Sequence, residues 1–359
     1  ALDLTGGIDP AREHVFAERP DNPEMRDSVS FWVSDDRGAL GLPRIGIEAV
    51  ASQWTEHGLQ VNVAFPDGRA FRVRTDGPAW PVEGSDGRPA VLGAGPLAFT
   101  CVEPFRSWTM TFAGPATQTS TVDLVEGHTG GPSVDVAFAV EATMAVPPWI
   151  QGTLQADAAD RLETSIEGDL IGGPRYEQLF RATGTVHVGG GDGDGGGAEH
   201  AFTGTGLRIR RQGVRRLAGF WGHCWQSALF PSGRAFGYIA YPPRPDGEPT
   251  FNEGYVFDGD GDLVPARVVT APWLTTLQPL GADVSLELET SRGAVRIEGE
   301  TVVSAFDIHH DDQTLATQAL KQAMPSFPAL HQGGVRYRWD GEETYGMIER
   351  SYPLDKITR

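Results

Sequence analysis

The heptapeptide Phe65-Pro66-Asp67-Gly68-Arg69-Ala70-Phe71 returns as Phe230-Pro231-Ser232-Gly233-Arg234-Ala235-Phe236, with six of seven positions identical. The copies are offset by 230 − 65 = 165 residues in a chain of 359. Each carries a Pro-Asp-Gly or Pro-Ser-Gly turn, which suits a β-hairpin because glycine adopts a positive φ at little cost. Since strand-like runs flank both copies, the repeat predicts two related β units, which we place at residues 1–170 and 171–359.

Patterning outside the repeat also predicts strands. In Ser107-Trp108-Thr109-Met110-Thr111-Phe112 every second side chain is apolar, which places these side chains on one face of a strand. Similar runs lie at 59–64, 134–140, 284–288, 294–297 and 335–339, separated by turn signals. The pattern predicts an all-β, antiparallel meander, with a helix expected only over 313–324. The glycine tract at 189–197 has the composition of a linker, but the offset of 165 predicts a loop inside the second unit.

Composition excludes several functional classes. The chain has 29 basic and 48 acidic residues and a net charge of −19, which argues against a nucleic-acid or anionic-membrane binder, because both need a cationic face. Glycine and proline total 46 + 26 = 72 residues, which disfavours a helical bundle. No apolar run reaches the roughly 18 residues of a membrane span, and no signal-peptide pattern begins the chain. We therefore expect a cytoplasmic protein without a membrane span.

Motifs for metals and cofactors are weak. The chain lacks a phosphate-binding loop, a G-x-S-x-G elbow and an H-E-x-x-H pair. Residues 258–262 resemble the start of an EF-hand, but Leu263 and Val269 replace its glycine and glutamate, so we interpret the segment as a polar turn. In the run at 309–312, His-His-Asp-Asp, neighbouring side chains would point to opposite faces of a strand and so would not converge on one metal. Two cysteines, Cys101 and Cys224, are too few for a disulfide framework. We expect no metal and no cofactor.

The richest segment for chemistry is 213–227. On a strand, Trp221, His223 and Trp225 share one face, which places an imidazole between two indoles. An apolar enclosure would lower the pKa of His223 and leave a neutral base near physiological pH. The indoles could wall an apolar ligand and stabilise developing positive charge. The alternative is a packed core strand whose histidine is satisfied by hydrogen bonds, and the residues alone leave both interpretations open.

Two other segments supply acids. The segment 252–258 carries Glu253 and Tyr255 on one face, and the last strand region carries Glu349. A carboxylate that faces a dry interior titrates upward and could act as a general acid. Paired with arginine, the same group would be structural, and for each acid alone we prefer the structural interpretation.

The two-halved β organisation, with Arg215-Arg216 leading into Trp221-Gly222-His223-Cys224-Trp225, resembles the AttH and carotenoid 1,2-hydratase (hydroxyneurosporene synthase) group of lipocalin-like double-barrel proteins. The sequence is similar to an actinobacterial branch of this group in three further segments: residues 103–108, the run Arg175-Tyr176-Glu177-Gln178, and residues 340–349. The resemblance implies two lipocalin-like β-barrels packed together, with a ligand in a barrel mouth or at the interface. Members of the wider group hydrate, isomerise or cyclise hydrophobic unsaturated molecules without organic cofactors.

The match to the hydratase branch is partial. His223-x-Trp225 matches its His-x-Trp pair, but its Tyr-x-Asp pair is not reproduced. Tyr238 is followed by Ile239-Ala240, and Tyr255 has Asp258 one place late. The departure leaves the proton donor open.

The resemblance predicts a cofactor-independent hydro-lyase or isomerase for a hydrophobic alkenol or terpenoid-like substrate. His223 would exchange the proton, Glu253 or Asp258 would protonate a hydroxyl or double bond, and Tyr238 and Tyr255 would orient it. The residues expected to bind substrate are Trp221, Trp225, Arg216, Phe220 and Tyr241. Two alternatives remain: a non-catalytic, lipocalin-type carrier of a hydrophobic metabolite, and a carbohydrate-active protein, suggested by nine Trp and abundant acids.

Overall fold

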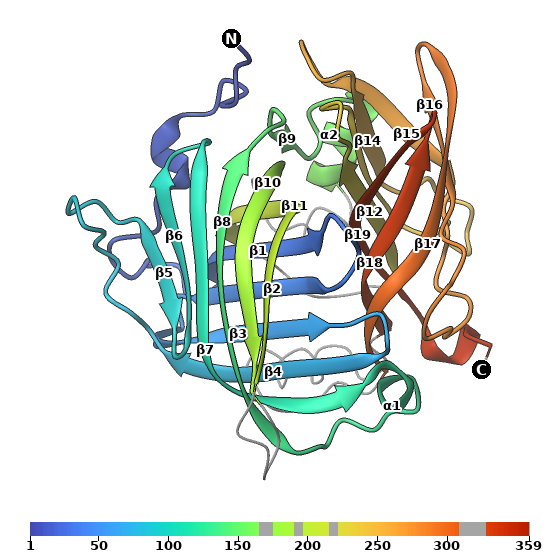
Figure 1. Ribbon diagram of the computed structural model, residues 1–359. Helices are drawn as coiled ribbons and strands as arrows, with labels where there is room; N and C mark the ends of the chain where they lie inside the picture. Colours follow the sequence, from blue (N-terminus) through green and yellow to red (C-terminus); the bar gives the residue numbers. More distant parts are fainter. Residues whose placement is uncertain (165–174, 190–196, 215–221, 309–327, 359) are drawn as a thin grey trace.

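Strands make up most of the chain in the computed structural model, which describes residues 1–164, 175–189, 197–214, 222–308 and 328–358 (Figure 1). The helices within these ranges are short: η1 (Pro10–Glu13), α1 (Thr121–Val125), α2 (Ala156–Thr164) and η2 (Leu354–Lys356). None of them has the length and apolar character needed to cross a membrane. The helix predicted at 313–324 and the 309–312 run lie outside the described residues.

The first sheet closes on itself. Its ring contains β1 (Met25–Asp35), β2 (Gly41–Val50), β3 (Gln53–Ala64), β4 (Arg69–Pro78), β7 (Ser107–Ser120), β8 (Ser133–Met144), β10 (Arg175–Val188) and β11 (Ala198–Val214). β1 pairs with β11, and the start of β4 pairs with the end of β7, which closes this ring of eight strands. The sheet also carries β5 (Val91–Ala94), β6 (Leu97–Glu103) and β9 (Trp149–Ile150).

The second sheet is a closed antiparallel barrel in simple chain order. It contains β12 (His223–Leu229), β13 (Ala235–Ala240), β14 (Asn252–Phe257), β15 (Val264–Thr270), β16 (Leu286–Thr290), β17 (Gly293–Asp307), β18 (Ala329–Trp339) and β19 (Glu342–Tyr352). β12 pairs with β19 to complete the ring. The all-β, double-barrel prediction is confirmed, and in Figure 1 the second barrel packs beside the first.

The repeated heptapeptide forms the same turn in each barrel. Phe65 N donates to Arg69 O at 3.0 Å, and Phe230 N donates to Arg234 O at 2.8 Å. Gly68 and Gly233 have φ values of +94° and +95°, in the region that favours glycine. The predicted hairpins are therefore correct.

The repeated hairpin occupies different places in the two barrels. It joins the third and fourth strands of the first barrel but the first and second strands of the other. The first strands of the barrels are consequently 223 − 25 = 198 residues apart, not 165. Sheet membership changes between Val214 and His223, which does not coincide with the predicted division at 170 and 171. The glycine tract accordingly connects β10 and β11 of the first barrel, contrary to the prediction that it belongs to the second unit.

Of the four apolar clusters among the described residues, three matter for the site. One lies in the first barrel and includes Trp108, Met110 and Phe112, as the period-two pattern predicts. Another lies in the second barrel around Tyr238 and Tyr337. A further cluster joins the barrels, with Trp32, Trp149, Leu179, Leu207 and Ile209 from the first and Trp225, Leu229, Ile239, Tyr255 and Met347 from the second. The candidate site lies at this interface between the barrels.

Candidate functional site

His223 begins β12 and faces the first barrel. Its cross-strand partner is Ser351, and the Nδ1 of His223 lies 2.6 Å from Ser351 Oγ. Its Nε2 lies 3.4 Å from Glu349 Oε1. Both ring nitrogens are therefore engaged by protein groups. Burial lowers the pKa of His223, with Glu349 opposing the shift, so the predicted direction is confirmed and the imidazole is neutral near pH 7.

Glu349 connects His223 to the first barrel. Arg44 Nη1 lies 2.7 and 2.9 Å from the two carboxylate oxygens, and Gln332 Nε2 donates to Oε2 at 3.1 Å. Burial alone would raise the pKa of Glu349, but the charge of Arg44 and the contact with His223 hold it well below its ordinary value. Glu349 therefore stays ionised, as a fixed negative charge at the interface.

Trp225 shares the face of His223 and lies at the centre of the interface. Its ring meets Trp32 edge-on at 4.7 Å between centroids, and the Arg175 guanidinium lies over it at 4.4 Å. Arg44 similarly covers Trp32 at 5.1 Å. Two indoles from different barrels thus lie beneath two cations, an arrangement that the face of an aromatic ring stabilises.

Glu177 on β10 is the acid of this cluster that titrates in the neutral range. Its side chain is buried, with the residue 1% exposed, and Gln151 Nε2 donates to its Oε2 at 3.0 Å. Arg175 Nη2 lies 3.9 Å from the same oxygen, beyond hydrogen-bond distance. Burial raises the pKa of Glu177 to about 7, against the opposing effects of Arg175, the Trp225 indole and Gln151. The indole N–H of Trp225 lies near the carboxyl, but without the distance and angle of a hydrogen bond. Both protonation states of Glu177 are therefore populated near neutral pH.

Polar atoms without partners gather around Glu177. Five buried atoms make no hydrogen bond with any residue that the structure describes: Arg175 Nε and Nη2, Trp225 Nε1, Glu177 Oε1 and Gln151 Oε1. A buried polar atom left unpaired costs about 1–3 kcal/mol, and buried polar groups of folded proteins are almost always paired. A local excess of unpaired donors and acceptors is typical of a functional site.

Glu253, a predicted proton donor, is occupied by the protein itself. Its Oε1 accepts from Trp149 Nε1 and from the backbone N of Gly152, both at 2.7 Å. Its Oε2 accepts from the backbone N of Leu154 and Gln155 at 3.2 and 3.0 Å. Burial raises the pKa of Glu253, against these four donors. The arrangement ties the 149–155 segment to the second barrel and leaves no oxygen facing a substrate.

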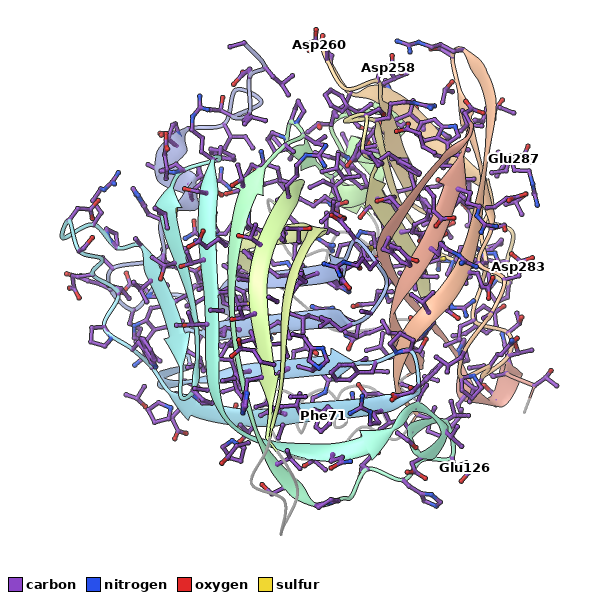
Figure 2. All side chains as sticks on the ribbon, viewed as in Figure 1. Phe71, Glu126, Asp258, Asp260, Asp283 and Glu287 are labelled. Carbon is purple, nitrogen blue, oxygen red and sulfur yellow. The ribbon has the colours of Figure 1, made fainter. Side chains whose placement is uncertain are left out.

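Two other predicted residues lie away from His223. Tyr238 points into the second barrel, where its hydroxyl contacts Gln226 and lies 3.1 Å from Cys224 Sγ, on the opposite face of the sheet. Asp258 lies on the surface, 54% exposed, and pairs with Arg292 (Figure 2). These placements remove both from the candidate site, because alternation turns Tyr238 inward and Asp258 follows the end of β14.

The remaining predicted residues divide in two groups. Tyr255 and Tyr241 belong to the interface cluster, where Tyr255 meets Trp149 edge-on at 5.7 Å between centroids. Burial and the charge of Glu177 raise the pKa of Tyr255. Trp221, Phe220 and Arg216 lie outside the described residues.

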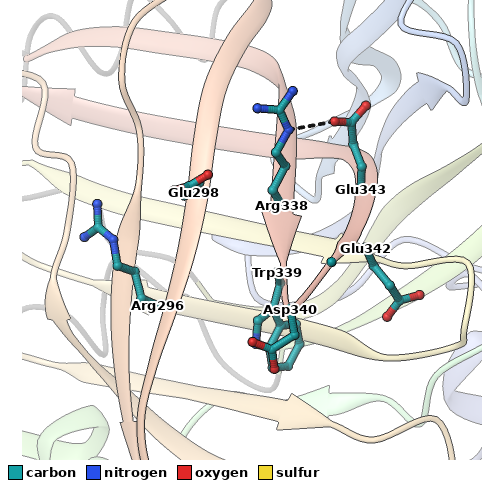
Figure 3. A pocket seen from close by; sticks show the side chains of 8 residues that line it. Arg296, Glu298, Arg338, Trp339, Asp340, Glu342 and Glu343 are labelled. Atoms are coloured by element: carbon teal, nitrogen blue, oxygen red, sulfur yellow. Dashed lines mark hydrogen bonds and ion pairs between the residues drawn. The ribbon is translucent and has the colours of Figure 1, made fainter.

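A separate groove of about 450 Å³ lies on the second barrel, at the β18–β19 hairpin (Figure 3). Its lining residues are Arg296, Glu298, Arg338, Trp339, Asp340, Gly341, Glu342 and Glu343. Within the groove Arg338 donates to Glu343 at 2.8 Å. None of the predicted site residues that lie in the described ranges lines it.

Sequence reasoning missed Glu177, Arg175 and Arg44 as site residues. Glu177 and Arg175 stand in one of the runs that carried the family resemblance, yet neither was proposed for a role. An arginine and a glutamate two places apart in a run of otherwise buried residues share one face of a strand, and this spacing was the available signal. Arg44 has no comparable signal, because its position depends on a β-bulge.

Comparisons with known proteins address the fold and the family. A crystal structure of a protein assigned as AttH from Nitrosomonas europaea has a TM-score of 0.53 at 15% identity, covering 96% of this chain and 99% of that chain. CghA gives 0.53 at 10% identity, covering 94% and 90%, and its structure with Sch210972 gives 0.51 at 10%, covering 93% and 89%. The predicted AttH-like, lipocalin-type double barrel is thereby confirmed as a fold.

The family described as Domain of unknown function (DUF7064) matches residues 9–353. That match spans both barrels and the interface between them. No curated protein sequence matches the chain.

Proposed function

The chain belongs to the family described as Domain of unknown function (DUF7064), and we propose that it is a cofactor-independent hydratase, dehydratase or isomerase acting between its two barrels. Its substrate is a hydrophobic alkenol or terpenoid-like molecule. One observation carries the proposal: a buried carboxyl, Glu177, has a pKa of about 7 and an unpaired oxygen beside unpaired donors. Such a group can give or take a proton at neutral pH without a cofactor.

The surroundings of Glu177 support an apolar substrate. Trp225, Trp32 and Tyr255 form aromatic walls around the acid, and Leu179 and Met347 extend the apolar surface. A site of this kind excludes bulk water and strengthens every electrostatic interaction inside it. CghA, whose fold is similar, has been crystallised with Sch210972, which supports ligand binding in proteins of this architecture.

We assign proton exchange to Glu177 and give His223 a positioning role. His223 was expected to exchange the proton, but Ser351 and Glu349 engage both of its nitrogens. The imidazole instead ties the start of β12, the strand that carries Trp225, to Ser351 and Glu349 of β19. Glu253 remains the anchor of the 149–155 segment in this assignment.

The test compares Glu177→Gln with the matched surface variant Glu141→Gln, since Glu141 is exposed on β8. Wild-type protein is incubated with a panel of terpenoid alcohols and their dehydrated counterparts, and products are identified by gas chromatography and mass spectrometry. We expect turnover that Glu177→Gln reduces by about 10²-fold or more, with Glu141→Gln unaffected. Full turnover in Glu177→Gln overturns the assignment. Binding without product by the wild type identifies a carrier instead.

A further inference from the structure

We propose that the substrate carries a carbonyl oxygen next to the reacting carbon, and that Arg175 and Trp225 bind this oxygen; the inference rests on the proposed function. An alkene or an aliphatic chain offers no acceptor to a guanidinium or an indole N–H. The donors left unpaired at the site include Arg175 Nε and Nη2 and Trp225 Nε1. Because one hydroxyl oxygen accepts at most two hydrogen bonds, these three donors call for a second oxygen beside the hydroxyl of the alkenol.

The donors are fixed relative to the acid. Arg175 and Trp225 are 5% and 2% exposed, and the guanidinium lies over the Trp225 ring at 4.4 Å. Arg175 Nη2 lies 3.9 Å from Glu177 Oε2, and Glu177 and Arg175 project from the same strand two residues apart. An oxygen held by the donors would therefore lie next to the carboxyl. Preorganised donors aimed at a developing negative charge are the usual means of stabilising an enolate.

The unpaired acceptors define a second substrate group. Glu177 Oε1 and Gln151 Oε1 make no hydrogen bond with any residue in the described ranges. Gln151 is held in place by the hydrogen bond that its Nε2 donates to Glu177 Oε2. A hydroxyl near the carbonyl would donate to one of these oxygens. The pattern as a whole fits a hydrophobic β-hydroxycarbonyl compound or the conjugated carbonyl compound that it forms on losing water.

The reaction balances with Glu177 as the only proton carrier. The Glu177 carboxylate removes a proton from the carbon that lies between the carbonyl carbon and the carbon bearing the hydroxyl. The electron pair of the broken C–H bond moves toward the carbonyl and forms an enolate, whose oxygen is held by Arg175 and Trp225. As the carbonyl re-forms, that pair makes the carbon–carbon double bond and the carbon–hydroxyl bond breaks. Glu177 returns its proton to the departing hydroxyl, water leaves, and the carboxylate is restored. Hydration is the reverse sequence.

The experiment uses a pair of probes that differ at one group, the ketone dihydro-β-ionone and the alcohol dihydro-β-ionol. Binding is measured by titration calorimetry, and enolate formation by proton NMR of hydrogen–deuterium exchange beside the ketone in deuterated buffer. The variants are Arg175→Lys, Trp225→Phe, which keeps the ring and removes the N–H, and Glu177→Gln. Arg181→Lys is the matched control, because Arg181 is an exposed arginine of the same strand. Circular dichroism and thermal denaturation establish that each variant is folded.

We expect the ketone to bind several-fold more tightly than the alcohol, because the hydroxyl is drawn toward the unpaired oxygens of Glu177 and Gln151, to which it donates, and so accepts less well from Arg175 and Trp225. Arg175→Lys and Trp225→Phe should each weaken ketone binding several-fold and alcohol binding less. Wild-type protein and Arg181→Lys should accelerate exchange beside the ketone, whereas Glu177→Gln should not.

Equal affinity for the two probes, unaffected by Arg175→Lys and Trp225→Phe, overturns the carbonyl inference. The proposed function survives that result if an alkenol without a carbonyl is still converted in a Glu177-dependent way. Failure of the folded wild type to bind either probe overturns the inference, and absence of any Glu177-dependent product across the alcohol panel overturns the function.

Discussion

Arg44 combines an unusual backbone conformation with an ion pair to the other barrel. Its φ is +69°, in a region that non-glycine residues rarely adopt, and it lies where the register of β2 against β3 shifts. The guanidinium reaches Glu349 of the other barrel at 2.7 Å. Since such strain persists only where surrounding contacts fix it, the ion pair and the bulge depend on each other.

Replacing Glu349 should therefore be costly. Glu349→Gln leaves the partly buried Arg44 without its counter-charge, and we expect about 3 kcal/mol of lost stability at pH 7, measured by urea denaturation. Because the folded-state pKa of Glu349 lies below its unfolded value near 4.5, the difference from wild type should shrink as pH falls below 4.5. Glu343→Gln, an exposed partner of Arg338, should change stability little. A loss no larger than that of Glu343→Gln would contradict the prediction.

Glu177 should destabilise the protein at neutral pH. Its pKa is about 7 in the folded protein and near 4.5 in the unfolded chain, so folding favours the neutral acid. The cost is absent below pH 4.5, grows as pH rises, and is complete above 7, where it reaches about 3 kcal/mol. Glu177→Gln, which cannot ionise, should therefore be more stable than wild type at pH 8 but not at pH 4.5. If the free energies of unfolding of the two proteins changed in parallel across this pH range, the pKa of Glu177 would not be raised in the folded protein.

The two copies of the repeated turn allow a matched comparison. Gly68 and Gly233 share a φ near +95°, and the nearest atom to an added Cβ is more than 4 Å away at Gly68 and 3.6 Å away at Gly233. Gly68→Ala and Gly233→Ala should therefore cost similar amounts, about 1 kcal/mol each, from backbone strain alone. Gly130→Ala is the control, since its Cβ also meets open space without a positive φ. Unequal losses in chemical denaturation would indicate that the turns differ in tertiary role.

Strands and turns were predictable because their signals are local. The alternation at 107–112 and the glycine of each repeated turn are read within a few residues, and both predictions hold. The predicted division at residue 170 does not coincide with the position where the chain passes from one sheet to the other. The repeat marks one hairpin only, whereas barrel closure depends on which strands pair over long distances. The same limit separates Glu253 from Glu177: both are buried acids, and only the tertiary contacts show that four donors occupy the first and leave an oxygen of the second unpaired.

Charged contacts join the two barrels in addition to the apolar ones. Arg72 and Arg74 of the first barrel contact Asp307 of the second at 2.9 and 2.7 Å. Arg72 Nε donates to Asn62 Oδ1, Asn62 Nδ2 donates to Gln332 Oε1, and Gln332 Nε2 donates to Glu349. Because these groups are largely buried, neither barrel can unfold without exposing unpaired charge on the other face.

The protein should consequently unfold as one unit although it contains two closed barrels. Scanning calorimetry should give a single transition whose calorimetric and van't Hoff enthalpies agree. Asp307→Asn, which leaves Arg72 and Arg74 without their shared carboxylate, should lower the temperature of that transition by several degrees and keep it single, because the apolar cluster around Trp32 and Trp225 still joins the barrels. Asp67→Asn, whose partner Arg69 is exposed, should leave the transition in place. Two separate transitions in the wild type would show that each barrel is stable without the interface, and the catalytic assignment would then concern a site that can open while both barrels stay folded.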